Sequence, residues 1–554
     1  MNAAVPSRRE LFGVAAALGF GTATFHRAVA AEVAAQPAAV TVTPEMIEKA
    51  EWVAGVTLTD EQRKEAAKAL TSTVRAAASL HKVEITNAVA PAMHFVPNPG
   101  QAPSTEGRGK VSLAPSAANK PDADDDLAFA PLSQLAELIR TKKVSSTELT
   151  KLYLARLKKY DPALLCVVTL TEELALKQAA EADKEIAAGK YRGPLHGIPW
   201  GAKDLIAYPG FKTTWGAGHY KDQTLEGKAT VASRIDDAGA VLAAKTTLGA
   251  IAMGDQWFGG MTRNPWNVKV GSSGSSAGSA SAVAAGLVGF AIGSETLGSI
   301  VSPCTRCGVT GLRPTFGRVS RAGCMALSWS MDKIGPIARS VEDCALIFGV
   351  IHGADGKDAT AVDRPFHWPC PKPLKEIRVG YTGSPDRDEV KVLKDIGVKL
   401  VPIKLPSEIP LGPLQTILNV ESSAAFDDVG RANVTEGLGR WPSTFRHARF
   451  VSAVDYLRAQ RARTLVMEQM AKAIDGVDLY VGGNDLVLTN FTGHPTVVLP
   501  NGFTKSGSPT ALTFTGRLWG ETELLAVAKA YQDATGHHTK RPDMSKVTKE
   551  NAGL

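Results

Sequence analysis

A stretch rich in glycine and serine, from Gly271 to Gly286, restricts what this chain can fold into more than any other part of its sequence. It reads GSSGSSAGSASAVAAG, with six serines and four glycines among sixteen residues. A flexible linker would not run directly into ASAVAAGLVGFAIGSETLGS, where small residues suit a tightly packed helix and VGFAIG suits a buried strand. A phosphate-binding loop would carry a lysine at the start of the helix, and none follows these glycines. We therefore expect a loop in which backbone segments approach one another closely beside the core.

A second glycine- and serine-rich segment, GSETLGS, follows the predicted strand and ends in Ser299. Backbone amides at such a turn can face one point and form an oxyanion hole. Ser299 is therefore a candidate nucleophile, and a nucleophilic serine needs a base. No histidine occurs between residues 220 and 350. A lysine whose pKa is lowered by burial can serve instead.

Lys203, in GPLHGIPWGAKDLI, is the candidate base because it follows an apolar run and small residues that predict a buried position. Asp204 beside it leaves the assignment open, since a neighbouring carboxylate can hold the lysine in its charged form. Taken one at a time, these residues also fit structural roles. A serine in a glycine-rich loop is most often structural, and a lysine next to an aspartate is most often half of an ion pair.

Helical patterns alternate with short apolar strands over most of the chain. Strands are expected at AVLAAK, DLYVGG and PTVVLP, and helices within LSQLAELIRTKKVSSTELTKLYLARLKKYDP, where Ser145 and Glu148 cap the second helix. This alternation predicts an α/β fold with a largely buried sheet.

The N-terminal region differs in composition from the rest. Arg8 and Arg9, a moderately apolar run and the sequence Ala28-Val29-Ala30 are typical of an export signal, here of the twin-arginine type. The apolar run is short and rich in Gly, Ala and Thr, which disfavours a membrane span. We expect a periplasmic or secreted protein with no stable membrane insertion after processing, while retention by an uncleaved anchor stays open.

Helix-capping signals follow the export signal. Thr43 precedes Pro44 at one predicted helix start, and Thr59 with Gln62 makes a capping box at another. A stretch rich in Pro, Gly, Ser and Asp comes next and reads as a linker or as a chain lying over the surface. The chain is thus divided into an export signal (1–30), a helical N-terminal segment (31–96), a linker (97–126) and one large domain (127–554).

Charge and cysteine content exclude some classes of function. The formal net charge of +7 is small for 554 residues, and no long basic run follows residue 9, so nucleic-acid binding is not indicated. Cys304 and Cys307 form a C-x-x-C pair, but no second pair or suitable histidine lies nearby to complete a zinc site. Buried thiols that pack as small hydrophobic groups are expected instead.

Together these segments resemble the amidase signature family, from about Leu132 to the C-terminus. GSSGSSAGSASAVAAGLVGFAIGSETLGSIVSPCTRCGVTGLRPTFGRVS is similar to the family's long glycine- and serine-rich signature. GPLHGIPWGAKD is similar to its lysine motif, and SWSMDKIGPIARSVEDCAL to the segment that follows the signature. The resemblance implies a mixed, largely buried central sheet covered by helices. It also implies hydrolysis of a small-molecule carboxylic amide through an acyl-enzyme, with no cofactor and no metal.

The family's Ser-cisSer-Lys triad maps onto this sequence by motif position. Ser299 is implied as the nucleophile, Ser275 as the bridging serine after a cis peptide bond, and Lys203 as the base. The backbone amides of the oxyanion hole are implied at Thr296, Leu297, Gly298 and Ser299.

The sequence departs from the family pattern close to the nucleophile. The family commonly has Gly-Gly where this chain has Leu297-Gly298, and Asp where Glu295 stands. It often has Arg at the position of Val301 and Gly at that of Ala277. All three triad positions are intact, so activity is expected, whereas substrate preference carries over less directly.

Other site residues rest on weaker patterns. Met253, Trp257 and Phe258 are predicted to line an acyl pocket, although simple core packing fits them equally well. Asp332, in SMDKIGP, is predicted to support the site from outside the triad, although a turn carboxylate fits equally well.

Two alternative functions stay open, as does a homodimer. One is the glutamine-hydrolysing A component of a tRNA-dependent amidotransferase, which releases ammonia from glutamine. The export signal argues against it, because charged tRNA is cytoplasmic. The other is a non-catalytic binding protein on the same fold, against which the intact triad argues.

Overall fold

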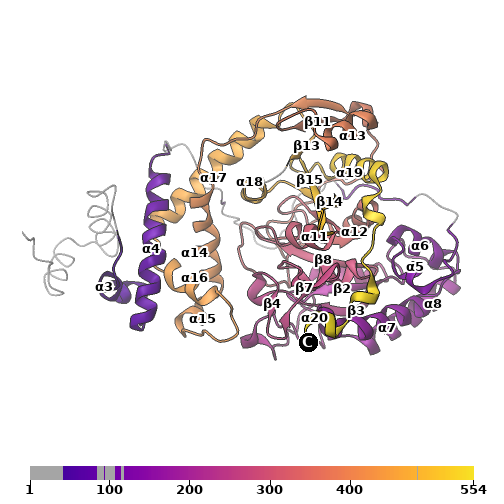
Figure 1. Ribbon diagram of the computed structural model, residues 1–554, viewed down its shortest axis with the longest axis horizontal. Helices are drawn as coiled ribbons and strands as arrows, with labels where there is room; N and C mark the ends of the chain where they lie inside the picture. The colour runs from indigo at the N-terminus through magenta and orange to yellow at the C-terminus, as the bar shows by residue number, and fades with distance from the viewer. Residues whose placement is uncertain (1–40, 84–92, 94–106, 114–117, 483–484) are drawn as a thin grey trace, which may run out of the picture. The chain divides into compact units, whose positions relative to one another are not determined.

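The computed structural model describes residues 41–83, 93, 107–113, 118–482 and 485–554 (Figure 1). The export signal predicted for residues 1–30 lies outside the described residues. The chain forms two compact units. The smaller unit combines the described residues up to 83 with Ile409–Asn433 and Ser443–Ala462, and the larger unit contains the rest. The domain boundaries drawn from the sequence stay a prediction, and these units are discontinuous in the chain.

A mixed sheet of 11 strands forms the centre of the larger unit. In spatial order its strands are β1 (Val167–Leu170), β3 (Val241–Thr246), β2 (Pro199–Lys203), β8 (Phe290–Glu295), β10 (Lys333–Ala338), β9 (Thr310–Arg313), β14 (Thr496–Phe503), β15 (Pro509–Gly516), β13 (Leu479–Gly482), β11 (Arg378–Tyr381) and β12 (Lys399–Pro402). Two small two-stranded sheets lie beside it, β4 (Gln256–Trp257) with β5 (Gly260–Met261), and β6 (Arg263–Asn264) with β7 (Asn267–Gly271).

Helices surround this sheet in Figure 1 and several of them pack on its strands. They are α5 (Asp124–Ala128), α6 (Leu132–Arg140), α7 (Ser146–Leu164), α8 (Glu172–Ala187), α9 (Thr230–Asp237), α10 (Ala277–Ala284), α11 (Val301–Cys307), α12 (Val341–Ile351), α13 (Asp388–Ile396), α18 (Leu486–Thr492), α19 (Glu521–Thr535) and α20 (Lys549–Ala552). Helices α10 and α11 flank the middle of the sheet and belong to its main apolar core.

The sheet confirms the α/β class and the mixed, largely buried arrangement predicted from the sequence. The three predicted apolar strands are present as β3, β13 and β14. Strand β8 contains the run FAIGSE, and α10 is buried at every residue, as its small side chains predicted. The caps are also confirmed, since Ser145 accepts a hydrogen bond from the amide of Glu148 and Thr59 forms a capping box with Gln62.

Helices make up the smaller unit, as predicted for the N-terminal segment. They are α3 (Pro44–Ala54), α4 (Asp60–His81), α14 (Gln415–Ala425), α15 (Asp427–Arg431), most of α16 (Trp441–Ala448) and the first part of α17 (Ala453–Ala473). Apolar side chains of α3 and α4 form a small core with Leu58 and Phe450. Arg446 of α16 pairs with Glu65 of α4, so helices far apart in the sequence are joined within this unit.

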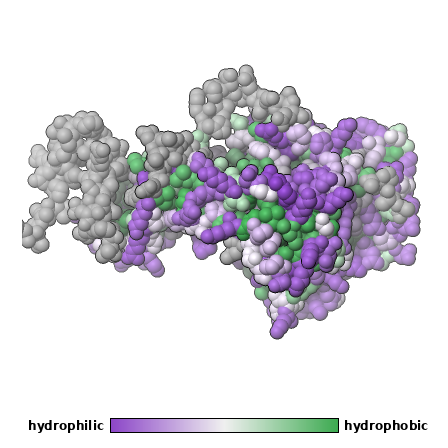
Figure 2. All heavy atoms as spheres, turned by 90° about the horizontal axis from the view of Figure 1, so that it is seen from above, coloured by the Kyte–Doolittle hydropathy of each residue, from purple (hydrophilic) through white to green (hydrophobic). Residues whose placement is uncertain are grey.

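Part of the predicted linker lies along the surface of the larger unit. The segment around Val111 forms a parallel β-bridge with Trp368, and the amide of Ser112 donates to the Trp368 carbonyl. Hydrophilic residues predominate on the face shown in Figure 2, with hydrophobic residues gathered in a smaller area. Among the described residues, no helix is long and apolar enough to span a membrane.

Candidate active site

The predicted catalytic residues meet at the carboxyl ends of two parallel strands. Strands β2 and β8 are adjacent and parallel, with Ala202 paired to Ile292. Lys203 is the last residue of β2, and β8 runs through Ser294 to Glu295 before the chain turns toward Ser299. Because parallel strands end at the same edge of a sheet, Lys203 and the loop that carries Ser299 share one edge, where ligands of α/β proteins commonly bind.

Lys203 is fully buried and its amine is surrounded by hydroxyl groups. Nζ lies 2.8 Å from Oγ of Ser275, 3.1 Å from Oγ of Ser276 and 2.9 Å from Oγ of Ser294. It also lies 3.2 Å from the Ser294 carbonyl oxygen. A neutral amine has two N–H donors and one lone pair, so it can hold some of these groups as acceptors and take a proton from another.

Burial lowers the pKa of Lys203 from the ordinary lysine value of 10.5 to about 7, against the opposing charges of Asp332 and Glu295. Asp204 does not hold Lys203 in its charged form. Its side chain lies 2.8 Å from Nζ of Lys245 and accepts hydrogen bonds from Thr214. The ion pair left open by the sequence therefore exists, but it joins Asp204 to a different lysine.

The peptide bond between Gly274 and Ser275 is cis, as the family resemblance implied. Gly274 is also required for space, because a Cβ atom at this position would lie 1.8 Å from the carbonyl oxygen of Gly254. This close approach between backbone segments is what the composition of the glycine- and serine-rich stretch predicted. The result places the Ser275 hydroxyl against Lys203 at the start of α10.

The other serines of the stretch bind mainly to backbone, as expected. Ser279 donates to the Ile292 carbonyl and Ser281 to the Arg263 carbonyl, which fastens α10 to β8 and β6. Ser276 differs, because its hydroxyl contacts Lys203 and also exchanges hydrogen bonds with the backbone of Ser294.

The segment from Thr296 to Ser299 has unpaired backbone amides. No described residue accepts a hydrogen bond from the four amides of this segment, whereas the carbonyls of Gly298 and Ser299 accept from the amides of Ser302 and Ser276. Buried amides without an acceptor are rare in folded proteins. The half-buried Ser299 hydroxyl likewise makes no hydrogen bond to the described residues. These groups are free to bind a ligand.

The two positions before Ser299 have different backbone requirements. Gly298 has a φ of 94°, and a Cβ there would lie 2.9 Å from Cδ2 of Leu486, so a glycine is needed. Leu297 is not among the residues with positive φ. This explains how the chain tolerates leucine in place of the first glycine of the family pattern.

Glu295 and Arg313 form a fully buried ion pair behind the nucleophile, with 2.8 Å between Nη1 and Oε1. The other carboxylate oxygen of Glu295 accepts from the amides of Ile300 and Val301, which fixes the turn after Ser299. Burial would raise the pKa of Glu295, but the charges of Arg313 and Lys333 outweigh it and lower that pKa to about 2. The guanidinium that pairs with Glu295 thus comes from β9.

Asp332 is buried next to the oxyanion segment. Its carboxylate accepts a 2.6 Å hydrogen bond from the Thr296 hydroxyl and further bonds from the amides of Leu327 and Ser328. Burial raises the pKa of Asp332, against these hydrogen bonds. The carboxylate thus binds a turn and the Thr296 hydroxyl at once. Its role in supporting the site stays a prediction.

The predicted pocket residues lie on the loop and small sheet that precede the cis serine. Met253 is adjacent to Gly254, whose carbonyl packs on Gly274. The rings of Trp257 and Phe258 contact each other edge to face, 4.8 Å between centroids, and Phe258 is 43% exposed. Their role in an acyl pocket stays a prediction.

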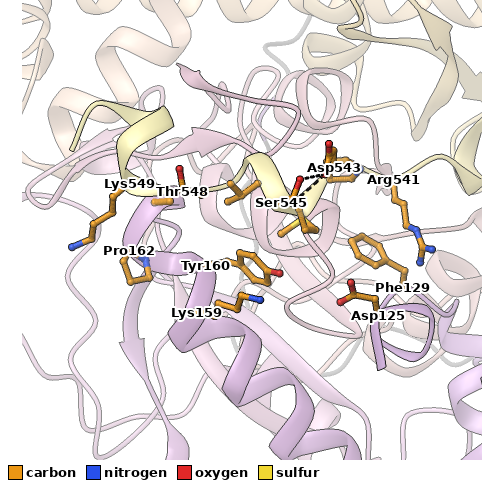
Figure 3. A pocket seen from close by; sticks show the side chains of 14 residues that line it. Asp125, Phe129, Lys159, Tyr160, Pro162, Arg541, Asp543, Ser545, Thr548 and Lys549 are labelled. Atoms are coloured by element: carbon orange, nitrogen blue, oxygen red, sulfur yellow. Dashed lines mark hydrogen bonds between the residues drawn. The ribbon is translucent and has the colours of Figure 1, made fainter. Parts of the chain in front are cut away.

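Two clefts differ in their relation to this site. One of about 870 Å³ is lined by Ser273, by Val301 and Ser302 of α11 and by Leu486 of α18. None of the described residues that line it is a predicted site residue, but Ser273 and Val301 are each close in sequence to a triad serine. The other, of about 960 Å³, lies between α7 and the C-terminal segment and contains none of the predicted site residues (Figure 3). Size alone therefore does not identify the active site.

The second cleft has side chains that pair with one another. Lys159 lies over the ring of Tyr160 and Arg541 over that of Phe129. In Figure 3, dashed lines join Ser545 to Asp543, whose side chain accepts both bonds. No serine–lysine pair of the kind seen at Lys203 lines this cleft among the described residues.

Sequence reasoning missed three contributors to the site. Ser276 and Ser294 both contact the Lys203 amine, and Arg313 pairs with Glu295. The serines carried a signal, since each neighbours a motif position. Arg313 carried none, because its pairing with Glu295 depends on the strand order β8, β10, β9.

The cysteines are free thiols in the structure, and Cys166, Cys304, Cys307 and Cys344 are buried. Burial raises the pKa of the Cys304 and Cys307 thiols well above the ordinary value. The described residues contain no group of three or more His, Cys, Asp or Glu side chains placed to hold a metal ion. The C-x-x-C pair therefore belongs to the apolar core, as predicted.

Comparisons with known proteins agree on one relationship. The family model Amidase matches residues 148–483. The A component of the glutamyl-tRNA(Gln) amidotransferase of Marinomonas sp. (strain MWYL1) is 34% identical over 484 residues, covering 75% of this chain and 99% of that protein. The same component of the Acinetobacter baumannii (strain AB0057) enzyme is 33% identical over 497 residues, covering 77% and 100%. The native peptide amidase from Stenotrophomonas maltophilia has a similar structure, with a TM-score of 0.66, 30% identity, and coverage of 74% of this chain and 97% of that one.

Proposed function

The chain belongs to the amidase signature family, and we propose that it hydrolyses linear carboxylic amides through an acyl-enzyme formed on Ser299. One observation carries the proposal. The fully buried amine of Lys203, with a pKa of about 7, lies 2.8 Å from the hydroxyl of Ser275, beside a loop whose amides find no acceptor in the part of the chain that the structure describes. A base, a proton relay and an electrophilic site are thus next to one another.

The reaction begins with proton transfer along the serines. The neutral amine of Lys203 takes the proton of Ser275, which takes the proton of Ser299 as Oγ of Ser299 attacks the amide carbonyl carbon. The negative charge that forms on the carbonyl oxygen is stabilised by the amides of the Thr296–Ser299 segment. Collapse of the intermediate breaks the C–N bond, and the proton returns through Ser275 to the leaving nitrogen.

Hydrolysis of the acyl-enzyme uses the same groups in reverse roles. Water loses its proton through Ser275 to Lys203 and adds to the acyl carbon. Release of the carboxylic acid then restores the Ser299 hydroxyl. Every step moves a proton between groups of this chain and the substrate, so the mechanism requires no group beyond the triad and the loop amides.

The natural substrate is proposed to be a small linear amide, including a peptide amide. The cleft of about 870 Å³ beside Val301 and Ser302 has the size of a small-molecule binding site. The peptide amidase named above shares the fold. An amide panel with released ammonia or amine as the readout tests this assignment.

The proposed location is the periplasm or the outside of the cell. It rests on the paired Arg8 and Arg9, the apolar run and the Ala-Val-Ala sequence alone. The protein is expected to leave the cytoplasm folded, because a twin-arginine signal directs that route.

The glutamine-hydrolysing component of a tRNA-dependent amidotransferase is the second candidate, and the curated relatives named above favour it. Such a component would release ammonia from glutamine and depend on partner proteins. Turnover of simple amides by the isolated chain, with no stimulation by charged tRNA, would favour the first candidate. Hydrolysis of glutamine and of none of the simple amides would favour the second candidate.

Covalent labelling tests the nucleophile directly. A fluorophosphonate probe should label the wild-type chain at Ser299, and Ser299→Ala should lose both the label and at least about 10³-fold in kcat while unfolding at the same temperature. Ser281→Ala is the matched control from the same serine-rich stretch, since its hydroxyl only binds the Arg263 carbonyl. Label at another residue, or near-normal turnover by Ser299→Ala, would remove the assignment.

A further inference from the structure

We propose that Lys333 is a positioning residue that aims the Leu297 amide at the substrate oxygen, an inference that rests on the proposed function of this site. Lys333 is the first residue of β10 and lies opposite Glu295, the last residue of β8. Its side chain is buried, with 3% of the residue exposed. The triad mechanism gives it no role.

The amine of Lys333 binds backbone at the start of the oxyanion segment. Nζ donates to the carbonyl oxygen of Met331 and, at 3.5 Å, to that of Thr296. The second contact is at the upper limit of hydrogen-bond length and is the weaker of the two. No other described donor reaches this carbonyl.

Fixing the Thr296 carbonyl also fixes the next amide. The peptide bond between Thr296 and Leu297 is not among the cis bonds of the structure. In a trans peptide the C=O of one residue and the N–H of the next point in opposite directions within one plane. With the Thr296 carbonyl turned toward Lys333, the N–H of Leu297 points away from Lys333.

Asp332 holds the same residue by its side chain. The Thr296 hydroxyl donates to Asp332 at 2.6 Å. The consecutive residues Asp332 and Lys333 therefore bind Thr296 through its hydroxyl and through its carbonyl. Because the hydroxyl and the carbonyl of Thr296 are both held, the peptide plane between Thr296 and Leu297 has little freedom to rotate. Oriented donors of this kind stabilise a developing oxyanion only when their direction is set before the reaction.

Lys333 acts from behind the site and does not touch substrate. The cavity it borders, with Ser294, Thr296 and Asp332, has room of about 10 Å³, which is about one water molecule. A substrate does not fit there. The role is therefore positioning, and the reacting atoms lie on the opposite side of the Thr296–Leu297 peptide.

Charged groups of both signs surround the Lys333 amine. Burial lowers the pKa of Lys333 well below its ordinary value, as do Arg313 and Arg463, while Glu295 and Asp332 act in the opposite direction. A lysine amine has at least two N–H groups, enough for the two carbonyls it contacts.

The test is Lys333→Met, which keeps the length of the side chain and removes the donor. Removing a whole oxyanion donor costs about 10²–10³-fold in kcat, so a misaligned one should cost at least about tenfold. We expect that loss in kcat with KM within about twofold. The Ki of a trifluoromethyl ketone analogue of the substrate, which forms a tetrahedral adduct with the serine, should rise by the same factor. The pH midpoint set by Lys203 should stay in place.

Two further variants keep the test decisive. Lys333→Gln retains an N–H donor on a side chain one atom shorter, so it should lose less kcat, with a proportionate rise in Ki, and it carries the test if the methionine variant does not fold. Arg339→Met is the matched control, because Arg339 follows the other end of β10 and donates to the carbonyls of Ala130 and Val288. It should lower the unfolding temperature and leave kcat within about twofold.

The outcomes separate this inference from the proposed function. A wild-type chain without label on Ser299 would overturn both. A labelled wild type together with a folded Lys333→Met enzyme of unchanged kcat would overturn only the role of Lys333. The role of Lys333 would also be overturned if Lys333→Met lowered kcat without changing the Ki of the ketone. It would be overturned likewise if Arg339→Met lowered kcat as much as Lys333→Met.

Discussion

Replacing Lys203 by methionine should stabilise the folded protein while removing its activity, and the gain in stability should shrink as the pH rises. The reason is the pKa of Lys203, about 7 in the folded protein against 10.5 for an ordinary lysine. Below pH 7 the lysine is charged in both states, and the folded state bears the full cost of burying it. Above 10.5 it is neutral in both states and the cost vanishes. Methionine has no such cost at any pH.

The size of the effect follows from the two pKa values. They differ by about 3.5, and each pKa unit corresponds to about 1.4 kcal/mol, so burial of the charge costs about 5 kcal/mol at acidic pH. The same relation leaves about 2 kcal/mol at pH 9. The lost hydrogen bonds to Ser275, Ser276 and Ser294 offset part of the gain, at about 1 kcal/mol each, and do not depend on pH. The stability difference between the two proteins should therefore fall by about 3 kcal/mol from pH 6 to pH 9.

Urea unfolding of both proteins at pH 6, 7.5 and 9 measures this difference. Ser299→Ala is the control, since it removes activity and leaves Lys203 in place, and its stability relative to wild type should not vary with pH. The kcat/KM of the wild type should rise through about pH 7 as Lys203 loses its proton. A stability difference for Lys203→Met that is the same at all three values of pH would mean that the lysine is charged in the folded enzyme and is not the resting base.

Two further predictions concern specificity and export. Leu297→Gly should raise the ratio of kcat/KM for bulky amide substrates to that for small ones. The reason is that an ordinary backbone conformation directs the leucine side chain beside the backbone N–H groups that face the substrate. An unchanged ratio would mean that the Leu297 side chain faces the core. Arg8→Lys together with Arg9→Lys should leave the precursor inside the cell, as fractionation would show, and efficient export of the double variant would exclude the twin-arginine route.

Much of the fold could be predicted because local patterns and buried structure agree. The strands β3, β13 and β14 are short apolar runs, and the cap at Ser145 follows from hydroxyl chemistry at a helix start. The strand order could not be predicted. Strand β8 lies between β2 and β10, neither of which was predicted as a strand, and such an order is fixed by packing between distant segments. For the same reason the sequence did not predict that Ile409–Asn433 joins the N-terminal helices in one compact unit.

Site residues that occupy a motif position could be predicted from the sequence. The charge state of such a residue could not, because it depends on side chains that are near in space and distant in sequence. Asp204 illustrates the difference. Lys203 ends β2 and Asp204 begins the turn after it, so the two sequence neighbours find different partners. Which partner each one finds depends on the adjacent strand, and β3 supplies Lys245 to Asp204. The lysine could therefore be named from sequence, but its loss of charge could only be derived once its surroundings were known.

Two departures from the family pattern near the nucleophile, Glu295 and Val301, are connected by a hydrogen bond from the Val301 amide to the Glu295 carboxylate. A carboxylate at position 295 with no cation beside it would be a buried, unpaired charge, which costs several kcal/mol. Here the guanidinium comes from Arg313 on β9, and Asn490 adds a hydrogen bond to the same oxygen. The second carboxylate oxygen stays free to hold the amides of Ile300 and Val301. Because the turn after Ser299 is fixed through these amides, valine at position 301 removes a charge from the cleft without loosening the nucleophile. That makes the cleft beside α11 more apolar than an arginine would, which favours amides without a negative charge near the scissile bond.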